Sequence, residues 1–140
     1  MEEVRAPTAE AALRRILTTA VRERVSDVHI EPQESFIRVR FRRDGILYDR
    51  FTMMLAMKKP ISVRAKVVGS MDIAESRLPQ DGSYSETVDG VSYDFRISTL
   101  PSLYGETIVI RILSGKVDWG RGQKVGPIDR GVRRSIYVFA

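Results

Sequence analysis

Two Asp-Gly pairs, each lying between segments in which apolar and polar residues alternate, constrain the fold of this chain more than any other feature. They are Asp44-Gly45, between residues 36–43 and 46–51, and Asp89-Gly90, between residues 83–88 and 91–99. Asp-Gly supplies the positive backbone angles of a tight turn, and alternation with a period of two is typical of half-buried strands. Each pair therefore predicts an antiparallel hairpin. A third pair, Asp81-Gly82, follows Pro79 and Gln80 and predicts a turn in a loop. The same alternation predicts two further strands, at residues 26–32 and 106–113.

Two other segments show the spacing of helices. In residues 8–25 apolar side chains recur every three or four positions, and Thr8 is a suitable N-cap. Residues 60–68 carry a shorter apolar stripe, with Pro60 in the first turn. Together these patterns predict an α+β fold, in which one antiparallel sheet has the helices packed on one face. The arginines of the strands would then lie on the opposite face or at the strand ends.

Length and composition limit the classes of protein that the chain can belong to. Its 140 residues favour one domain, and 43% apolar with 29% charged residues is ordinary for a folded protein. Zero cysteines exclude disulfides and thiolate chemistry, and a lone His29 cannot form a metal site by itself. No apolar run approaches the roughly 20 residues of a transmembrane span, and the charged start lacks a signal-peptide core, so we expect a cytoplasmic protein. The net charge of +5 is compatible with nucleic acid, acidic lipid, nucleotide phosphate or an acidic protein as partner.

Three blocks of residues carry a resemblance to a known family. The first is residues 26–32 (SDVHIEP) with 38–45 (RVRFRRDG), and the second is residues 64–82, which include 71–82 (MDIAESRLPQDG). The third is residues 96–113, which include 96–101 (RISTLP), 105–107 (GET) and 111–113 (RIL). In this order they resemble the amino-terminal (N2) domain of the type II secretion and type IV pilus assembly ATPases, of the secretion-ATPase superfamily. The central block is close to the family's stretch D-I-A-E-x-R-L-P-Q-D-G, and accidental agreement at that many positions is implausible.

The resemblance implies a PAS-like regulatory domain of a hexameric ATPase that powers protein secretion or pilus assembly. Its implied partners are its own P-loop motor domain, neighbouring subunits of the hexamer and platform proteins of the inner membrane, to which it would be peripheral on the cytoplasmic side. ATP and Mg²⁺ are the implied cofactors of the full-length enzyme. Two arginines of the family's domain lie near the terminal phosphate of the nucleotide, and they match Arg96 and Arg111. A guanidinium fork suits that contact, and ordinary exposed strand arginines are the alternative interpretation, which spacing alone would favour.

The family's phosphate-binding loop, G-x-x-x-x-G-K-[ST], has no match in the chain. We therefore assign residues 1–113 to the amino-terminal regulatory domain and residues 114–140 to a tail or linker of unknown origin, with the P-loop motor domain absent. The tail lacks sustained apolar periodicity, so we expect it to pack poorly against the domain. The chain alone is predicted not to be catalytic, and no cofactor is expected to bind it tightly.

Several residues allow another interpretation. A stand-alone basic module that binds nucleic acid is the alternative function, with Arg38, Arg40 and Arg42 as phosphate contacts and Tyr84, Tyr93 and Phe95 as a stacking platform. Alternation, however, places Tyr93 and Phe95 on the core side, and three strand arginines are more often solvated charges. We expect no specific nucleic-acid partner. We expect His29 to be structural, and Asp72, Glu75 and Asp81 to make local hydrogen bonds.

Overall fold

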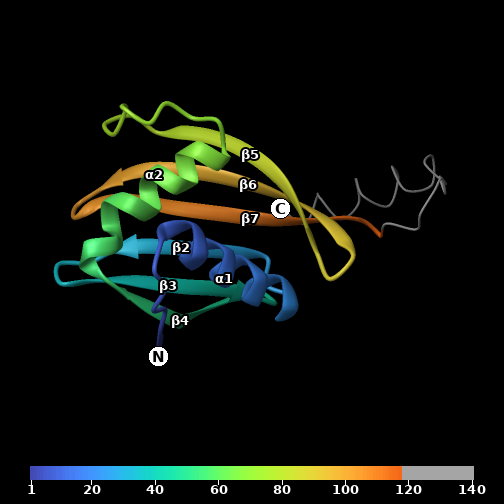
Figure 1. Cartoon of the computed structure of the whole chain (residues 1–140). Coiled ribbons are helices and arrows are strands. Elements are labelled where there is room, and N and C mark those ends of the chain that lie inside the picture. Colours follow the sequence, from blue (N-terminus) through green and yellow to red (C-terminus); the bar gives the residue numbers. More distant parts are fainter. Residues whose placement is uncertain (118–140) are drawn as a thin grey trace.

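The computed structural model describes residues 1–117, which form a sheet and two α-helices (Figure 1). The elements in chain order are β1 (Glu2–Glu3), α1 (Ala9–Arg22), β2 (Asp27–Pro32), β3 (Phe36–Arg43), β4 (Ile46–Met54), the 3₁₀ turn η1 (Leu55–Met57), α2 (Lys58–Val68), β5 (Gln80–Val88), β6 (Val91–Ser102) and β7 (Gly105–Val117). The predicted α+β fold is confirmed. The expected behaviour of the tail concerns mainly residues 118–140, which lie outside the described residues.

Helix α1 forms where the periodicity predicts it. The Thr8 side chain accepts a hydrogen bond from the backbone N–H of Ala11 at 3.1 Å, which satisfies one of the free donors of the first turn. The helix ends at Arg22, three residues before the predicted end at residue 25, and Arg24 follows with a positive φ. Its apolar stripe is buried, namely Ala12, Leu13, Ile16, Leu17 and Ala20.

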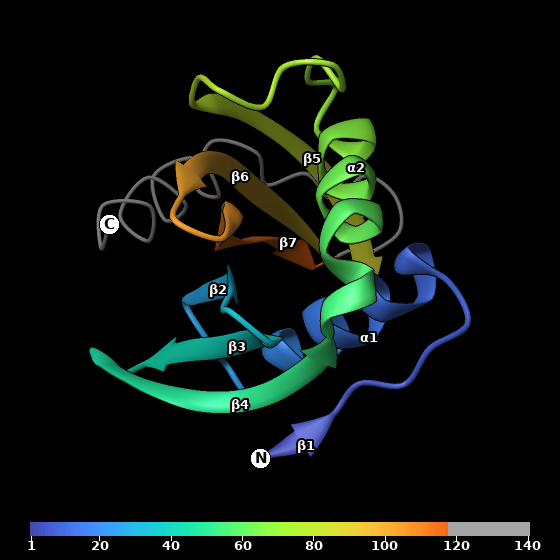
Figure 2. The same ribbon diagram turned by 90° about the vertical axis from the view of Figure 1, so that its left-hand side faces the viewer.

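Helix α2 begins two residues earlier than predicted, at Lys58. Pro60 still falls in the first turn, where its missing N–H leaves no helical hydrogen bond unmade. The helix stops at Gly69, and Ser70 takes a positive φ of 58°. Both α-helices lie on the same face of the sheet, as Figures 1 and 2 show from two directions. Neither of these described helices is long and apolar enough to cross a membrane.

The sheet has the strand order β1-β4-β3-β2-β7-β6-β5. Two three-stranded antiparallel groups, β4-β3-β2 and β7-β6-β5, are joined by antiparallel pairing of β2 with β7. In this pairing Asp27 lies opposite Arg111 and Ile30 lies opposite Ile108, although about 80 residues separate the partners in sequence. The core is formed between the sheet and α1, with further contacts from α2.

The prediction of a wholly antiparallel sheet is wrong at one edge. Strand β1 pairs in parallel with β4, so that the sheet is mixed. Two residues are too few to show an alternating pattern, and the pairing arises because Val4, which follows β1, is buried in the core and donates its N–H to Thr52 O. Strand β7 also runs past the predicted end at Leu113 as far as Val117.

The two hairpin turns have the predicted backbone. Asp44 and Gly45 both have positive φ, as do Asp89 and Gly90. A third turn, expected at Asp81-Gly82, is wrong, because both residues lie within β5. Gly82 is required there for a different reason: a Cβ at this position would lie 2.3 Å from the carbonyl oxygen of Gly69. The end of α2 can approach β5 closely only because this residue has no side chain.

Candidate functional site

The face of the sheet turned away from the helices carries a cluster of charged side chains, which we call the arginine face. Its members alternate along their strands with buried core residues such as Val28, Phe41 and Ile110, and they therefore point the other way. The arginine face consists of Asp27, His29 and Glu31 of β2, Arg38, Arg40 and Arg42 of β3, Arg96 of β6 and Arg111 of β7. The predicted position of the strand arginines, opposite the helices, is confirmed for these five. It is wrong for Arg50 of β4, which lies at a register shift in the β3–β4 pairing and binds Glu23 at the end of α1.

Four of these side chains form one row across four strands. Asp27 lies opposite Arg42 on one side and opposite Arg111 on the other, and Arg111 lies opposite Arg96. The two arginines that the sequence singles out are thus direct cross-strand neighbours, although fifteen positions separate them in sequence. Residues directly opposite in antiparallel strands have Cβ atoms about 5 Å apart, so one small ligand can reach both side chains.

Arg96 and Arg111 carry positive charge that their surroundings balance only in part. Arg96 is exposed and makes no hydrogen bond or ion pair with residues 1–114. Arg111 is 41% exposed, and its Nε donates a hydrogen bond to Oδ1 of Asp27 at 2.9 Å. Like charges directly opposite each other destabilise a sheet. An anion between the two guanidinium groups would remove this repulsion, so the pair is chemically suited to bind a phosphate.

Asp27 is the carboxylate that holds Arg111. Its side chain is 7% exposed. Oδ1 accepts from Arg111, whereas Oδ2 accepts from Ser26 Oγ at 3.0 Å and lies 3.8 Å from Nε of Arg42. One negative charge is therefore shared between two arginines, and the row of four residues keeps a net positive charge.

Glu31 balances the other two arginines of β3. Arg40 binds it through Nε at 3.0 Å and Nη2 at 2.8 Å, and Arg38 approaches the same carboxylate at 3.2 Å. Burial would raise the pKa of Glu31, but the hydrogen bond and the charges of these arginines outweigh burial and lower it. Since Arg38 and Arg40 are already engaged by a carboxylate, they are less suited to bind a phosphate-rich partner than Arg96.

His29 lies between Asp27 and Glu31 on the same strand. Burial lowers its pKa, in opposition to the two neighbouring carboxylates, so the imidazole is neutral near pH 7. The carboxylates of Asp27 and Glu31 are both bound to arginines, and this position is compatible with the expected structural role of His29.

The aromatic residues of the alternative function do not form an exposed platform. Phe95 is fully buried, and its ring stacks on Tyr84 with 5.2 Å between centroids. Tyr84 and Tyr93 pack against the core, and burial raises the pKa of Tyr84 to about 12. The prediction that alternation places Tyr93 and Phe95 on the core side is confirmed.

Two of the three acidic residues of the block 71–82, Asp72 and Glu75, make the expected local hydrogen bonds, whereas the expectation is wrong for Asp81. Asp72 Oδ1 accepts from the N–H of Ala74, and Glu75 Oε2 accepts from the N–H groups of Arg77 and Leu78. Another residue of this block, Gln80, closes the loop from the other end, since its amide binds both N–H and C=O of Asp72. Asp81 instead accepts from Ser98 Oγ on the neighbouring strand.

A buried ion pair behind this loop was not expected from the sequence. Lys66 of α2 is 2% exposed, and its Nζ lies 2.8 Å from Oε1 of Glu106 at the start of β7. The same ammonium donates to the carbonyl of Glu75, and Ser62 donates to Glu106 Oε1. The available signal was that Lys66 follows Ser62 by four residues, next to the inward-facing Ala65, so that both lie on the buried side of α2.

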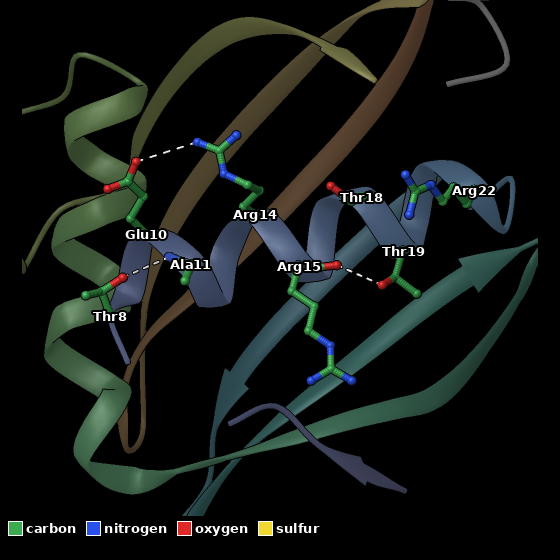
Figure 3. A pocket seen from close by; sticks show the side chains of 8 residues that line it. All are labelled: Thr8, Glu10, Ala11, Arg14, Arg15, Thr18, Thr19 and Arg22. Atoms are coloured by element: carbon green, nitrogen blue, oxygen red, sulfur yellow. Dashed lines mark hydrogen bonds and ion pairs between the residues drawn. The ribbon is translucent and has the colours of Figure 1, made fainter. Parts of the chain in front are cut away.

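A shallow hollow of about 570 Å³ runs along the outer side of α1 (Figure 3). Its arginines are already paired: Arg14 with Glu10 and Glu86, Arg15 with Glu2, and Arg22 with Asp89. It lies on the helical side of the sheet, opposite the arginine face, and so it does not contribute to the site around Arg96 and Arg111. Among the described residues, no three His, Asp or Glu side chains are grouped so that they could hold a metal ion.

A family model described as "Type II/IV secretion system protein" matches residues 2–124 of the chain. The chain belongs to this family. The match includes every strand and both helices described above, and with them the whole arginine face. The suspected resemblance to the secretion and pilus ATPases is thereby confirmed.

Three curated relatives are 43–45% identical to the chain over their aligned parts. The chain is 43% identical over 99 residues to the type IV pilus assembly ATPase PilB of Myxococcus xanthus, with 70% of this chain and 18% of the relative covered. It is 44% identical over 98 residues to type II secretion system protein E of Klebsiella pneumoniae, with 70% and 20% covered. PilB of Pseudomonas aeruginosa is 45% identical over 100 residues, with 71% and 18% covered. The aligned part thus spans about one fifth of the length of these curated relatives.

Proposed function

We propose that this chain is the amino-terminal regulatory domain of a hexameric ATPase that powers type II protein secretion or type IV pilus assembly. The support is its family membership and its similarity to relatives that are named as a pilus assembly ATPase and as a type II secretion protein. The α+β sheet with helices on one face is compatible with the PAS-like fold that this role implies. The domain would work with its own P-loop motor domain, neighbouring subunits and inner-membrane platform proteins, as a cytoplasmic component peripheral to that membrane.

The observation that carries the proposal is the cross-strand pairing of Arg96 with Arg111. In the proposed cycle this domain closes on the motor domain, and the two guanidinium groups reach the γ-phosphate of bound ATP. Their N–H groups then stabilise the negative charge that develops on the γ-phosphate oxygens during hydrolysis. Both side chains have unpaired N–H donors among the described residues, and this is what the role requires.

The residues of the arginine face fit a phosphate better than a metal ion. Its two carboxylates are bound to arginines, and among the described residues no cluster of three His, Asp or Glu side chains could hold a metal ion. Mg²⁺ and the β- and γ-phosphates would therefore be held by a P-loop in the motor domain. The chain by itself would bind ATP weakly and would not turn it over.

The test is to substitute each arginine in the full-length ATPase that carries this domain. We expect Arg96→Ala and Arg111→Ala to lower kcat by roughly 10³-fold while the nucleotide Kd changes far less, because the contact forms fully only in the transition state. Arg→Lys should restore only part of the rate, since an ammonium lacks the planar fork. Steady-state kinetics and equilibrium nucleotide binding measure the two effects separately.

Arg22→Ala is the matched control, because Arg22 is a surface arginine on the helical side of the sheet. Its kcat should stay close to that of the wild type. Near-normal kcat in both Arg96→Ala and Arg111→Ala would overturn the proposed role and would mean that both residues are ordinary surface arginines.

A further inference from the structure

We infer that Asp27 is a positioning residue, which holds the guanidinium of Arg111 in place for the phosphate and weakens anion binding in doing so. The inference rests on the proposed function of Arg111. It is based on the different contacts of the two carboxylates of β2: Glu31 binds arginines of β3, whereas Asp27 lies between an arginine of β3 and Arg111 of β7.

An unrestrained arginine on an open sheet face can adopt many rotamers, and ordering it when a ligand binds would be unfavourable. Arg111 is restrained by the hydrogen bond from its Nε to Asp27 Oδ1 at 2.9 Å. Asp27 is itself nearly buried, and its other oxygen is held by Ser26 Oγ at 3.0 Å. The acceptor is therefore rigid, and the plane of the guanidinium is set before any phosphate arrives.

The contrast with Glu31 shows that Asp27 does more than neutralise charge. Glu31 takes both Nε and Nη2 of Arg40, whose side chain is 27% exposed. Asp27 takes only Nε of Arg111, which is 41% exposed. Both Nη groups of Arg111 thus have no partner among residues 1–114 and are available to an anion. In Arg40, by contrast, Nε and Nη2 already donate to a carboxylate and are not available for a bidentate contact with a phosphate.

The same contact has an electrostatic consequence of opposite sign. The carboxylate of Asp27 is in direct contact with Arg111 and lowers the positive potential at the place where an anion would sit. If this negative charge is removed, a multivalent anion should bind more tightly, although the side chain of Arg111 loses its restraint. A residue that only supports the fold would, when changed, leave anion binding unaltered or weaken it.

The experiment uses the ¹⁵N-labelled 140-residue chain, with inorganic tripolyphosphate as the probe. We expect Asp27→Asn to move the Arg111 Nε–Hε resonance towards that of a free arginine, because a neutral amide oxygen is the weaker acceptor. Tripolyphosphate should bind roughly three- to ten-fold more tightly, as followed by chemical shifts near Arg96 and Arg111. In the full-length ATPase the same substitution should lower kcat without raising KM for ATP.

Glu31→Gln is the matched control, because it removes one negative charge from the same strand and the same face. Glu31 lies four residues from Asp27, or about 13 Å along a strand. This distance exceeds the electrostatic screening length of roughly 8 Å at physiological salt. The control substitution should leave the Arg111 resonance in place and change the affinity at that position by less than about two-fold. Thermal unfolding of both variants checks that the fold is retained.

The outcomes separate this inference from the proposed function. Suppose that Arg111→Ala weakens tripolyphosphate binding, but Asp27→Asn leaves the Arg111 resonance unmoved, weakens binding, or changes the affinity no more than Glu31→Gln does. The positioning role of Asp27 is then wrong, and the proposed role of the arginine pair is retained. If Arg96→Ala and Arg111→Ala both bind tripolyphosphate like the wild type and hydrolyse ATP normally as full-length proteins, the proposed function fails, and the role of Asp27 fails with it.

Discussion

Two glycines show how closely single residues are fitted where α2 meets the sheet. Gly69 ends α2, and Gly82 lies opposite it within β5. A Cβ on Gly82 would lie 2.3 Å from Gly69 O and 3.0 Å from the carbon of that carbonyl, which is backbone and cannot rotate aside. A side chain at position 82 would therefore separate the helix from the strand and disturb the loop between them.

Gly82→Ala should lower the free energy of unfolding by about 2–3 kcal/mol, because the added methyl group forces the two backbones apart. Urea unfolding of the chain measures this change. Ser83→Ala, an exposed position on the same strand, should change the free energy by less than about 0.5 kcal/mol. Equal stability of the two variants would mean that the approach of Gly69 to Gly82 is looser than described.

At the scale of elements, α2, β7 and the loop of residues 71–79 are joined by one buried ion pair. Lys66 contacts Glu106 and the carbonyl of Glu75, and Oε2 of Glu106 has no hydrogen-bond partner among the described residues. This oxygen depends entirely on the neighbouring ammonium for compensation of its burial. A buried pair of this kind contributes little net stability while it is intact, but loss of one partner leaves an uncompensated charge.

Lys66→Met should therefore destabilise the domain by about 3–5 kcal/mol, since Glu106 would remain buried without its cation. The double variant Lys66→Met/Glu106→Leu should recover much of that loss, because it buries no charge. Denaturant unfolding of the single and double variants measures both effects.

The matched control for this pair is Arg22→Met, which removes an exposed ion pair with Asp89. It should cost less than about 1 kcal/mol. If Lys66→Met were as mild as Arg22→Met, the Lys66–Glu106 contact would not be a buried, coupled pair.

At the scale of the whole molecule, the net charge of +5 is distributed over both sides of the sheet. On the helical side the arginines of α1 are paired with acids of β1, β5 and the β5–β6 turn. On the other side Arg38, Arg40 and Arg42 are paired with acids of β2. The described residues thus offer neither a broad unpaired basic surface nor an exposed aromatic platform to a nucleic acid.

The chain should accordingly bind single-stranded DNA or RNA weakly and without sequence preference, with an affinity that falls steeply as salt is raised, because counterion release is the main source of binding. Fluorescence anisotropy with labelled oligonucleotides of several sequences and at several salt concentrations measures this. Submicromolar, sequence-selective binding near physiological salt would instead favour the stand-alone nucleic-acid-binding module.

Local pattern was sufficient for most of the fold. Residues close in sequence produce the alternation in β2, β3, β6 and β7, the Asp-Gly turns and the capped apolar stripe of α1. These elements can therefore be predicted without the tertiary structure. The side of the sheet on which the arginine face lies follows from the same alternation. Arg96 and Arg111 were selected by their family motif and not by any local pattern, and their role in hydrolysis stays a prediction.

Contacts between distant segments were decided only by the tertiary structure. The parallel pairing of β1, the approach of Gly82 to Gly69 and the ion pair of Lys66 with Glu106 each join elements whose local sequence shows no partner. The register that places Asp27 beside Arg111, and Arg111 beside Arg96, is of the same kind. The amino-acid sequence by itself determined which faces of the strands are charged. Only the packing of the complete sheet, in which a shift of one residue would turn every side chain to the other face, decided which charges meet.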